Sequence, residues 1–156
     1  MTAVFEQHGL RIQYPENWTL QQGQAEGQGL EIQIVAPSGA FWSLLAFARQ
    51  NEGEPLMQEI LGNLEEQYDS VETSAVQESM GGFEASGHDT FFFYLDLLVA
   101  NRMRCLSAGE HRFLIIWQAE NRDFDNIEPV FQAITVGFLA SLDKNATLHI
   151  DAAADS

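Results

Sequence analysis

The run Phe41–Ala48 is the feature that most constrains how this chain can fold. It reads Phe-Trp-Ser-Leu-Leu-Ala-Phe-Ala, and Ser43 is its only polar residue. A strand with one face in water alternates apolar and polar side chains, whereas an almost unbroken apolar run suits a strand that is covered on both faces. A second run of this kind, Phe113–Trp117, occurs later in the chain. The sequence therefore predicts a sheet with a packed layer on each side.

A helical period in the middle of the chain predicts the first of two covering helices, over about Pro55–Tyr68. Apolar residues recur there at the spacing of one helix face, namely Met57, Ile60, Leu61, Leu64 and Tyr68. Pro55 suits a first helical turn, and Glu52 and Glu54 lie near the positive end of the helix dipole. The helix is therefore expected to be amphipathic.

The second helix is predicted over Asn126–Phe138. Asp125 followed three residues later by Glu128 resembles a capping box, and Pro129 would then fall in the tolerant first turn. Four apolar residues share one face of this helix: Ile127, Phe131, Ile134 and Phe138.

Short segments with strand character make up most of the remaining chain. Among them, the stretch after Phe83 is β-rich, and a turn at Leu98–Ala100 would set Asp96 opposite Arg102 and Tyr94 opposite Arg104. Strands buried on both faces, together with only two long helices, indicate an α+β fold in which helices sandwich an antiparallel sheet. We expect one domain over residues 1–142 and a loose acidic tail over residues 143–156.

Charge narrows the partners that the chain can bind. It has 23 acidic and 7 basic residues, a net charge of −16, and no basic residue lies between Arg49 and Arg102. Such a field repels phosphate backbones and anionic lipids, so nucleic acid and membrane are disfavoured, and a protein with a basic or mixed surface is favoured. The sequence begins without a secretory signal pattern and contains one cysteine, which predicts a cytoplasmic location.

The order of elements, together with the segment Tyr14-Pro15-Glu16-Asn17-Trp18, resembles the PsbP-like superfamily. This superfamily includes the photosystem II extrinsic protein PsbP, a Ran-binding nuclear import factor and adaptor chaperones of type VI secretion. The resemblance covers residues 4–142, but its one local signature is a short Tyr/Phe-Pro-x-x-Trp turn. It implies a binding protein without catalysis and carries no functional residue over to this chain, because fold alone does not define function.

The residue types that carry chemistry form no catalytic or cofactor-binding pattern in this sequence. Cys105 alternates with Met103 onto the face opposite Arg102 and Arg104, which predicts a buried structural thiol. The four histidines are scattered without zinc-ligand spacing, and the acidic segment 123–128 lacks the glycine and the final glutamate of a calcium loop. We therefore predict no enzyme, no metal and no cofactor.

Two surfaces are candidates for binding. The first is the outer face of the first helix, where the acidic residues Glu59, Glu66 and Asp69 fall opposite the apolar stripe. The second is a mixed polar and aromatic column, where alternation places on one strand face His88, Thr90, Phe92, Tyr94 and Asp96. The first surface predicts a protein-binding module of the adaptor or chaperone type. The alternative is that this charged face only keeps the protein soluble. The second surface predicts a small-ligand carrier or sensor with a pocket beside the aromatic strands.

Overall fold

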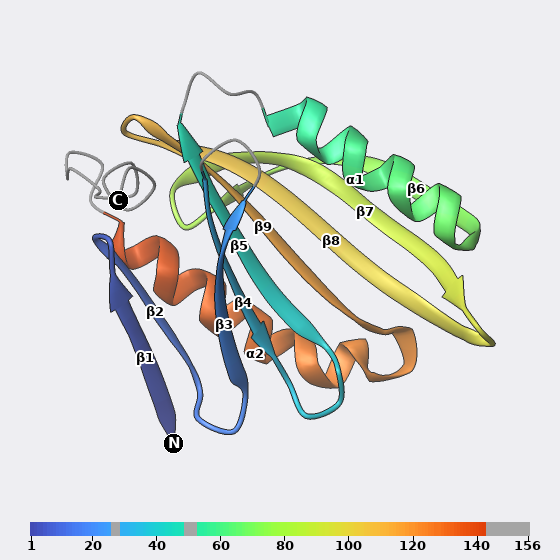
Figure 1. Cartoon of the computed structure of the whole chain (residues 1–156), viewed down its shortest axis with the longest axis horizontal. Helices are drawn as coiled ribbons and strands as arrows, with labels where there is room; N and C mark the ends of the chain where they lie inside the picture. Colours follow the sequence, from blue (N-terminus) through green and yellow to red (C-terminus); the bar gives the residue numbers. More distant parts are fainter. Residues whose placement is uncertain (26–28, 49–52, 143–156) are drawn as a thin grey trace.

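The computed structural model describes residues 1–25, 29–48 and 53–142 (Figure 1). It confirms the α+β prediction: a seven-stranded antiparallel sheet and a two-stranded hairpin are combined with two helices. The predicted tail lies outside the described residues. The elements are, in chain order, β1 (Thr2–Gln7), β2 (Leu10–Pro15), β3 (Thr19–Ala25), β4 (Gly29–Val35), β5 (Phe41–Ala48), α1 (Gly53–Gln67), β6 (Asp69–Met80), β7 (Phe83–Tyr94), β8 (Leu97–Ala108), β9 (His111–Glu120) and α2 (Asn121–Ser141).

The strand order of the large sheet places the most apolar strands in its interior. The order is β3-β4-β5-β9-β8-β7-β6, so β5 pairs with β9 rather than with the element that follows it in the chain. Both apolar runs that were recognised in the sequence therefore lie side by side in the middle of the sheet, where layers cover both faces (Figure 1).

Helix α2 and the β1–β2 hairpin cover one face of this sheet. Phe138 of α2 meets Trp42 and Phe113 edge-on, with ring centroids 6.2 and 5.5 Å apart. The Trp42 indole donates a hydrogen bond of 2.9 Å to the hydroxyl of Thr135, so the polar end of this buried ring is satisfied. The hairpin packs along α2 and adds Phe5, among others, to the same core.

Helix α1 covers the opposite face over β6 to β9 and forms a second, smaller core. Met57 and Leu61 are its buried apolar side chains, and they pack with Met103 and Leu114 from the sheet. The predicted helix agrees with α1 to within two residues at its start and one at its end. Asp69, which was assigned to the helix face, is instead the first residue of β6.

The predicted start of the second helix is wrong. Helix α2 begins at Asn121, immediately after β9, and its N-cap residue is Glu120, which makes no side-chain capping bond. Asp125 and Glu128 are inside the helix, and so is Pro129, which is exposed to solvent. Phe124 explains the earlier start, because its burial in the core requires the first turn to pack against the sheet.

The predicted register between β7 and β8 is also wrong. The turn lies at Leu95–Asp96, Tyr94 pairs with Leu97, and Arg102 and Arg104 are opposite Asp89 and Gly87. No turn-forming residue marks the first position of this turn, where Leu95 adopts a left-handed φ of 56°, which leucine rarely does. The error also moves both arginines to the other face of the sheet, because neighbouring residues of a strand point to opposite faces.

Gly87 permits the close approach of β7 and β8 at this register. A Cβ atom at Gly87 would lie 1.7 Å from the carbonyl oxygen of Met103 and 2.7 Å from its carbonyl carbon, both of them backbone atoms. The structure therefore requires glycine at this position, or a shift of the strand backbone.

We expect Gly87→Ala to lower the free energy of unfolding by about 1–3 kcal/mol, the usual cost of overpacking. Gly62 provides the matched control, because a Cβ there meets nothing within 4 Å and the residue lies inside α1. Gly62→Ala should raise stability by about 1 kcal/mol through helix propensity. Urea unfolding followed by circular dichroism measures both changes, and equal effects of the two substitutions would contradict this account of Gly87.

Candidate functional site

The predicted polar and aromatic column is mostly packed beneath α1. His88, Thr90 and Phe92 of β7 are buried, with exposed fractions of 9%, 0% and 2%. His88 Nε2 lies 2.9 Å from Glu54 Oε1 of α1, and the Phe92 ring stacks on Tyr68 at a centroid distance of 4.5 Å. Most of the column therefore packs against α1 and holds this helix on the sheet. It does not line a pocket.

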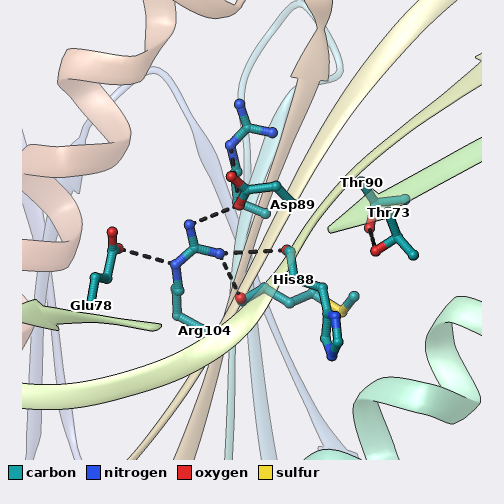
Figure 2. Close-up of polar contacts among 8 residues, drawn as sticks. Thr73, Glu78, His88, Asp89, Thr90 and Arg104 are labelled. Carbon is teal, nitrogen blue, oxygen red and sulfur yellow. Dashed lines mark hydrogen bonds and ion pairs between the residues drawn. The ribbon is translucent and has the colours of Figure 1, made fainter. Parts of the chain in front are cut away.

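The structure separates the two remaining members of the column from the others. Tyr94 is 52% exposed at the end of β7, and Asp96 is in the turn that follows. Thr90 shares a hydrogen bond of 3.1 Å with Thr73, which connects the edge strand β6 to its neighbour β7 (Figure 2). This bond gives the buried Thr90 hydroxyl a structural role.

A pocket does lie on this face of β7, at the other end of the strand. It has a volume of about 490 Å³ and is open to solvent. It is formed where the start of α1 meets β7, β8 and β9, and its lining includes Glu54, Glu84, Ser86, Cys105 and Arg112. The pocket lies on the same face of β7 as the predicted column, but none of the column residues is part of its lining.

Cys105 is buried at the wall of this pocket, with 6% of its surface exposed. It packs with Met103 in the core under α1, on the face opposite Arg102 and Arg104, as the alternation predicted. Burial raises the pKa of the Cys105 thiol, and the neighbouring Arg112 guanidinium opposes that shift without cancelling it. A protonated, buried thiol is a poor nucleophile.

Arg104 is the centre of an ion network on the other face of the sheet (Figure 2). Its guanidinium lies 2.7 Å from Asp89 and 3.1 Å from Glu78, and it donates a further bond of 2.9 Å to the Met103 carbonyl oxygen. Arg102 approaches the same Asp89 oxygen at 3.5 Å. Because the Arg104 side chain is 5% exposed, these partners are needed to offset the cost of burying its charge.

Aromatic rings provide the remaining contacts of the two arginines. Arg102 lies over the rings of Phe91 and Phe124, at 5.2 and 4.8 Å, and Arg104 lies over Trp117 at 5.7 Å. The predicted register set Arg104 opposite Tyr94, and the observed register instead places both arginines over these other rings. The network is structural, since its charged groups are occupied by one another.

The acidic surface that was predicted on the first helix is exposed. Glu59 and Glu66 are on the solvent side of α1, and Asp69 at the start of β6 is also exposed. Asp69 is opposite Phe93 in the β6–β7 pair. The structure therefore brings one member of this surface next to the end of the β7–β8 hairpin.

The end of this hairpin is a candidate site that the sequence interpretation missed. We call Phe93, Tyr94, Leu95 and Leu97 the hairpin tip; their exposed fractions are 43%, 52%, 80% and 36%. Figure 1 shows β7 and β8 extending past the neighbouring β9 at this end of the sheet. The sequence analysis placed Tyr94 in the polar and aromatic column and the turn at Leu98–Ala100, whereas a turn at Leu95–Asp96 would have predicted that these residues are exposed.

The described residues contain neither a cluster of potential metal ligands nor a helix suited to cross a membrane. Within residues 1–25, 29–48 and 53–142, no three His, Cys, Asp or Glu side chains are grouped so as to hold a metal ion. Neither of the two helices in these ranges combines the length and apolar character that a membrane span requires.

Comparison with known proteins gives a similarity of fold alone. No protein-family model matches the chain, and no curated protein matches its sequence. The solution structure of cyanobacterial PsbP (CyanoP) from Synechocystis matches with a TM-score of 0.62 over 86% of this chain and 88% of that one, at 9% identity. The chain shares a fold with PsbP.

A second solved structure supports the same architecture. A protein from Bacteroides thetaiotaomicron matches with a TM-score of 0.53 and 14% identity, over 83% of this chain and 46% of that one. The resemblance recognised in the sequence is therefore confirmed for the fold, and function has to be argued from the surface of this chain.

Glu54 makes the packing of α1 depend on pH. Its hydrogen bond from the Gln58 amide lowers the pKa of this carboxyl below its usual value of 4.5; partial burial opposes the shift, and the contact with His88 adds to it. A lowered folded-state pKa stabilises the fold above the unfolded-state pKa, and this stabilisation is lost as the pH falls through the folded-state pKa. We expect Glu54→Gln to lower the melting temperature at neutral pH, and the difference from the parent to shrink as the pH falls below 4.5. A pH-independent difference would show that the charge of Glu54 contributes nothing.

Burial of Cys105 predicts a slow thiol reaction. We expect a disulfide reagent such as DTNB to modify the native protein at neutral pH at least about 100-fold more slowly than the urea-unfolded chain, since the thiol must first become accessible. Absorbance of the released thiolate measures both rates. Rapid modification of the native protein would contradict the structural role assigned to Cys105.

Proposed function

We propose that this chain is a non-catalytic protein-binding module of the adaptor or chaperone type, and that it binds its partner through the hairpin tip. The exposure of four large apolar residues at one turn is the observation that supports this proposal. Apolar residues exposed singly are ordinary, whereas a contiguous group that projects into solvent is typical of an interaction surface.

The hairpin tip is suited to act as an anchor because aromatic contacts support it from behind. Tyr68, which follows α1, stacks on Phe92 and meets Tyr94 edge-on at 5.7 Å. Aromatic side chains that are already held in place lose little freedom on binding, and such residues dominate the energy of many interfaces.

Charge around the hairpin tip indicates the chemistry of the partner. Asp69 lies opposite Phe93, Asp96 is in the turn itself, and Glu66 is close to the end of α1. The partner that fits is a protein with an apolar groove bordered by basic residues. An anionic membrane is a poor match, because the acidic border would be repelled.

The pocket at the start of α1 supports the second candidate function, a small-ligand carrier or sensor. Its volume is in the range of ligand sites, and Arg112, Ser86 and Glu84 would give it both a cationic and a hydrogen-bonding wall. A ligand bound in this pocket would be small and polar. The partner of the hairpin tip would instead be a protein with an apolar groove.

Substitutions at the hairpin tip test the leading proposal. We expect Leu95→Asp to reduce capture of the partner from a lysate of the source cells by at least about 10-fold, because a charge would enter an apolar contact. Val136→Asp is the matched control: Val136 is also an exposed apolar residue, 55% accessible, but it lies on α2. Quantitative mass spectrometry of the captured proteins measures the loss.

A partner retained equally by the parent, Leu95→Asp and Tyr94→Ser would exclude the hairpin tip. Once a partner is identified, association rates provide a separate readout for the acidic residues. The triple change Glu59→Gln, Glu66→Gln and Asp69→Asn should slow association and weaken its salt dependence if the acidic face steers the partner, because exposed charges act over about 8 Å at physiological ionic strength.

A further inference from the structure

Strand β6 is the outermost strand of the large sheet, and it is unusually open. In the part of the chain that the structure describes, β6 pairs with β7 and with no other strand. It has 12 residues, none of which is buried. An edge strand of this kind presents a row of backbone N–H and C=O groups that another strand can pair with.

The devices that usually protect an edge strand are concentrated at one end of β6. Ser70 has a positive φ of 58°, and the register with β7 is irregular between Asp69 and Glu72. From Glu72 to Met80 the pairing with β7 is continuous, and this stretch contains no proline, lysine or arginine. A regular edge of this length offers room for a whole added strand, since strands commonly have about 5–6 residues.

The negative charge on β6 and on the neighbouring helix favours an added strand with basic side chains. β6 contributes Asp69 and Glu72, and Glu59 and Glu66 are exposed on the adjacent helix α1. The third acid of β6, Glu78, is already paired with Arg104. The nearby basic residues Arg102 and Arg104 of β8 form ion pairs with Asp89 and Glu78. The other edge strand, β3, carries no charged residue, so only the β6 edge discriminates by charge.

We propose that β6 binds an extended basic segment of a partner protein by adding it to the sheet as an eighth strand. Backbone hydrogen bonds would hold the segment, and its lysine or arginine side chains would be attracted by Glu72 and by the acidic surface around it. The inference rests on the proposed binding function and adds a second contact to it, separate from the hairpin tip.

A defined peptide tests the proposal without knowledge of the partner. The probe is a nine-residue peptide with lysine at alternate positions and valine or threonine between them. At about ten times its dissociation constant it should slow amide exchange in Glu72–Met80 by about tenfold, since exchange then requires release of the peptide. Two matched peptides serve as controls, one with glutamate in place of lysine and one with every central amide N-methylated. Neither should protect β6.

Neighbouring proline substitutions on β6 locate the contact. In an antiparallel pair, successive residues direct their N–H groups alternately toward the partner strand and away from it. One of the substitutions Ser74→Pro and Ala75→Pro therefore removes a backbone hydrogen bond to β7. The other removes only an N–H group that points away from β7, toward the open edge. The variant that keeps the parent's stability should bind the lysine peptide at least about tenfold more weakly.

Three results would overturn the inference. The N-methylated peptide could bind as tightly as the lysine peptide, which would show that charge alone attracts the peptide and that no strand is added. This result would reject the β6 proposal even if neither proline variant folds. Both proline variants could fold and bind the peptide like the parent. Sedimentation could show a dimer of this chain that the outward-facing proline dissociates, which would assign the edge to a second copy.

The hairpin tip is tested separately from the β6 edge. Leu95→Asp should leave peptide binding unchanged while it reduces partner capture. Suppose that Leu95→Asp loses partner capture while the outward-facing proline variant still binds the peptide normally. This result would reject the β6 proposal and keep the proposed function.

Discussion

Burial of the central strands on both faces is the constraint on which the rest of this structure depends. β5 and β9 are apolar on both sides, so each face of the sheet needs its own cover. Helix α2, with 21 residues, and the β1–β2 hairpin provide one cover, whereas α1 has only 15 residues. Neither cover reaches every strand, no residue of β6 is fully buried although α1 packs over this strand, and the end of the β7–β8 hairpin is exposed. The surfaces to which we assign binding are those that two helices and one hairpin leave exposed.

At the edge of the α2 layer, arginine side chains cover the sheet in place of a helix. Arg102 and Arg104 lie over aromatic rings on this face and form ion pairs with Asp89 and Glu78. A guanidinium can cover an aromatic face and still reach an acid at the edge of the sheet, which an aliphatic side chain cannot do. Two of the few basic residues in this acidic chain are thus used for structure, and the acids on β6 and α1 dominate the outer surface.

The similarity to PsbP concerns the arrangement of elements and not the surface that binds. Identity of 9% leaves the fold recognisable because many apolar sequences satisfy the same layered packing. The hairpin tip and the β6 edge depend instead on individual exposed residues and on the register between strands. For this reason the proposals above are drawn from the contacts of this chain alone.

The sequence by itself determined the fold class, the position of α1, the apolar face of α2 and the burial of Cys105, because each depends on a local period or alternation. It could not determine the turn at Leu95–Asp96 or the start of α2 at Asn121. Those were decided by contacts between distant segments: both arginines reach Asp89, and Phe124 packs in the core. The same limit explains the site. Alternation identified the face that carries His88 and Thr90, but only the tertiary structure showed that α1 covers this face and leaves Tyr94 exposed, since coverage depends on where a separate helix packs.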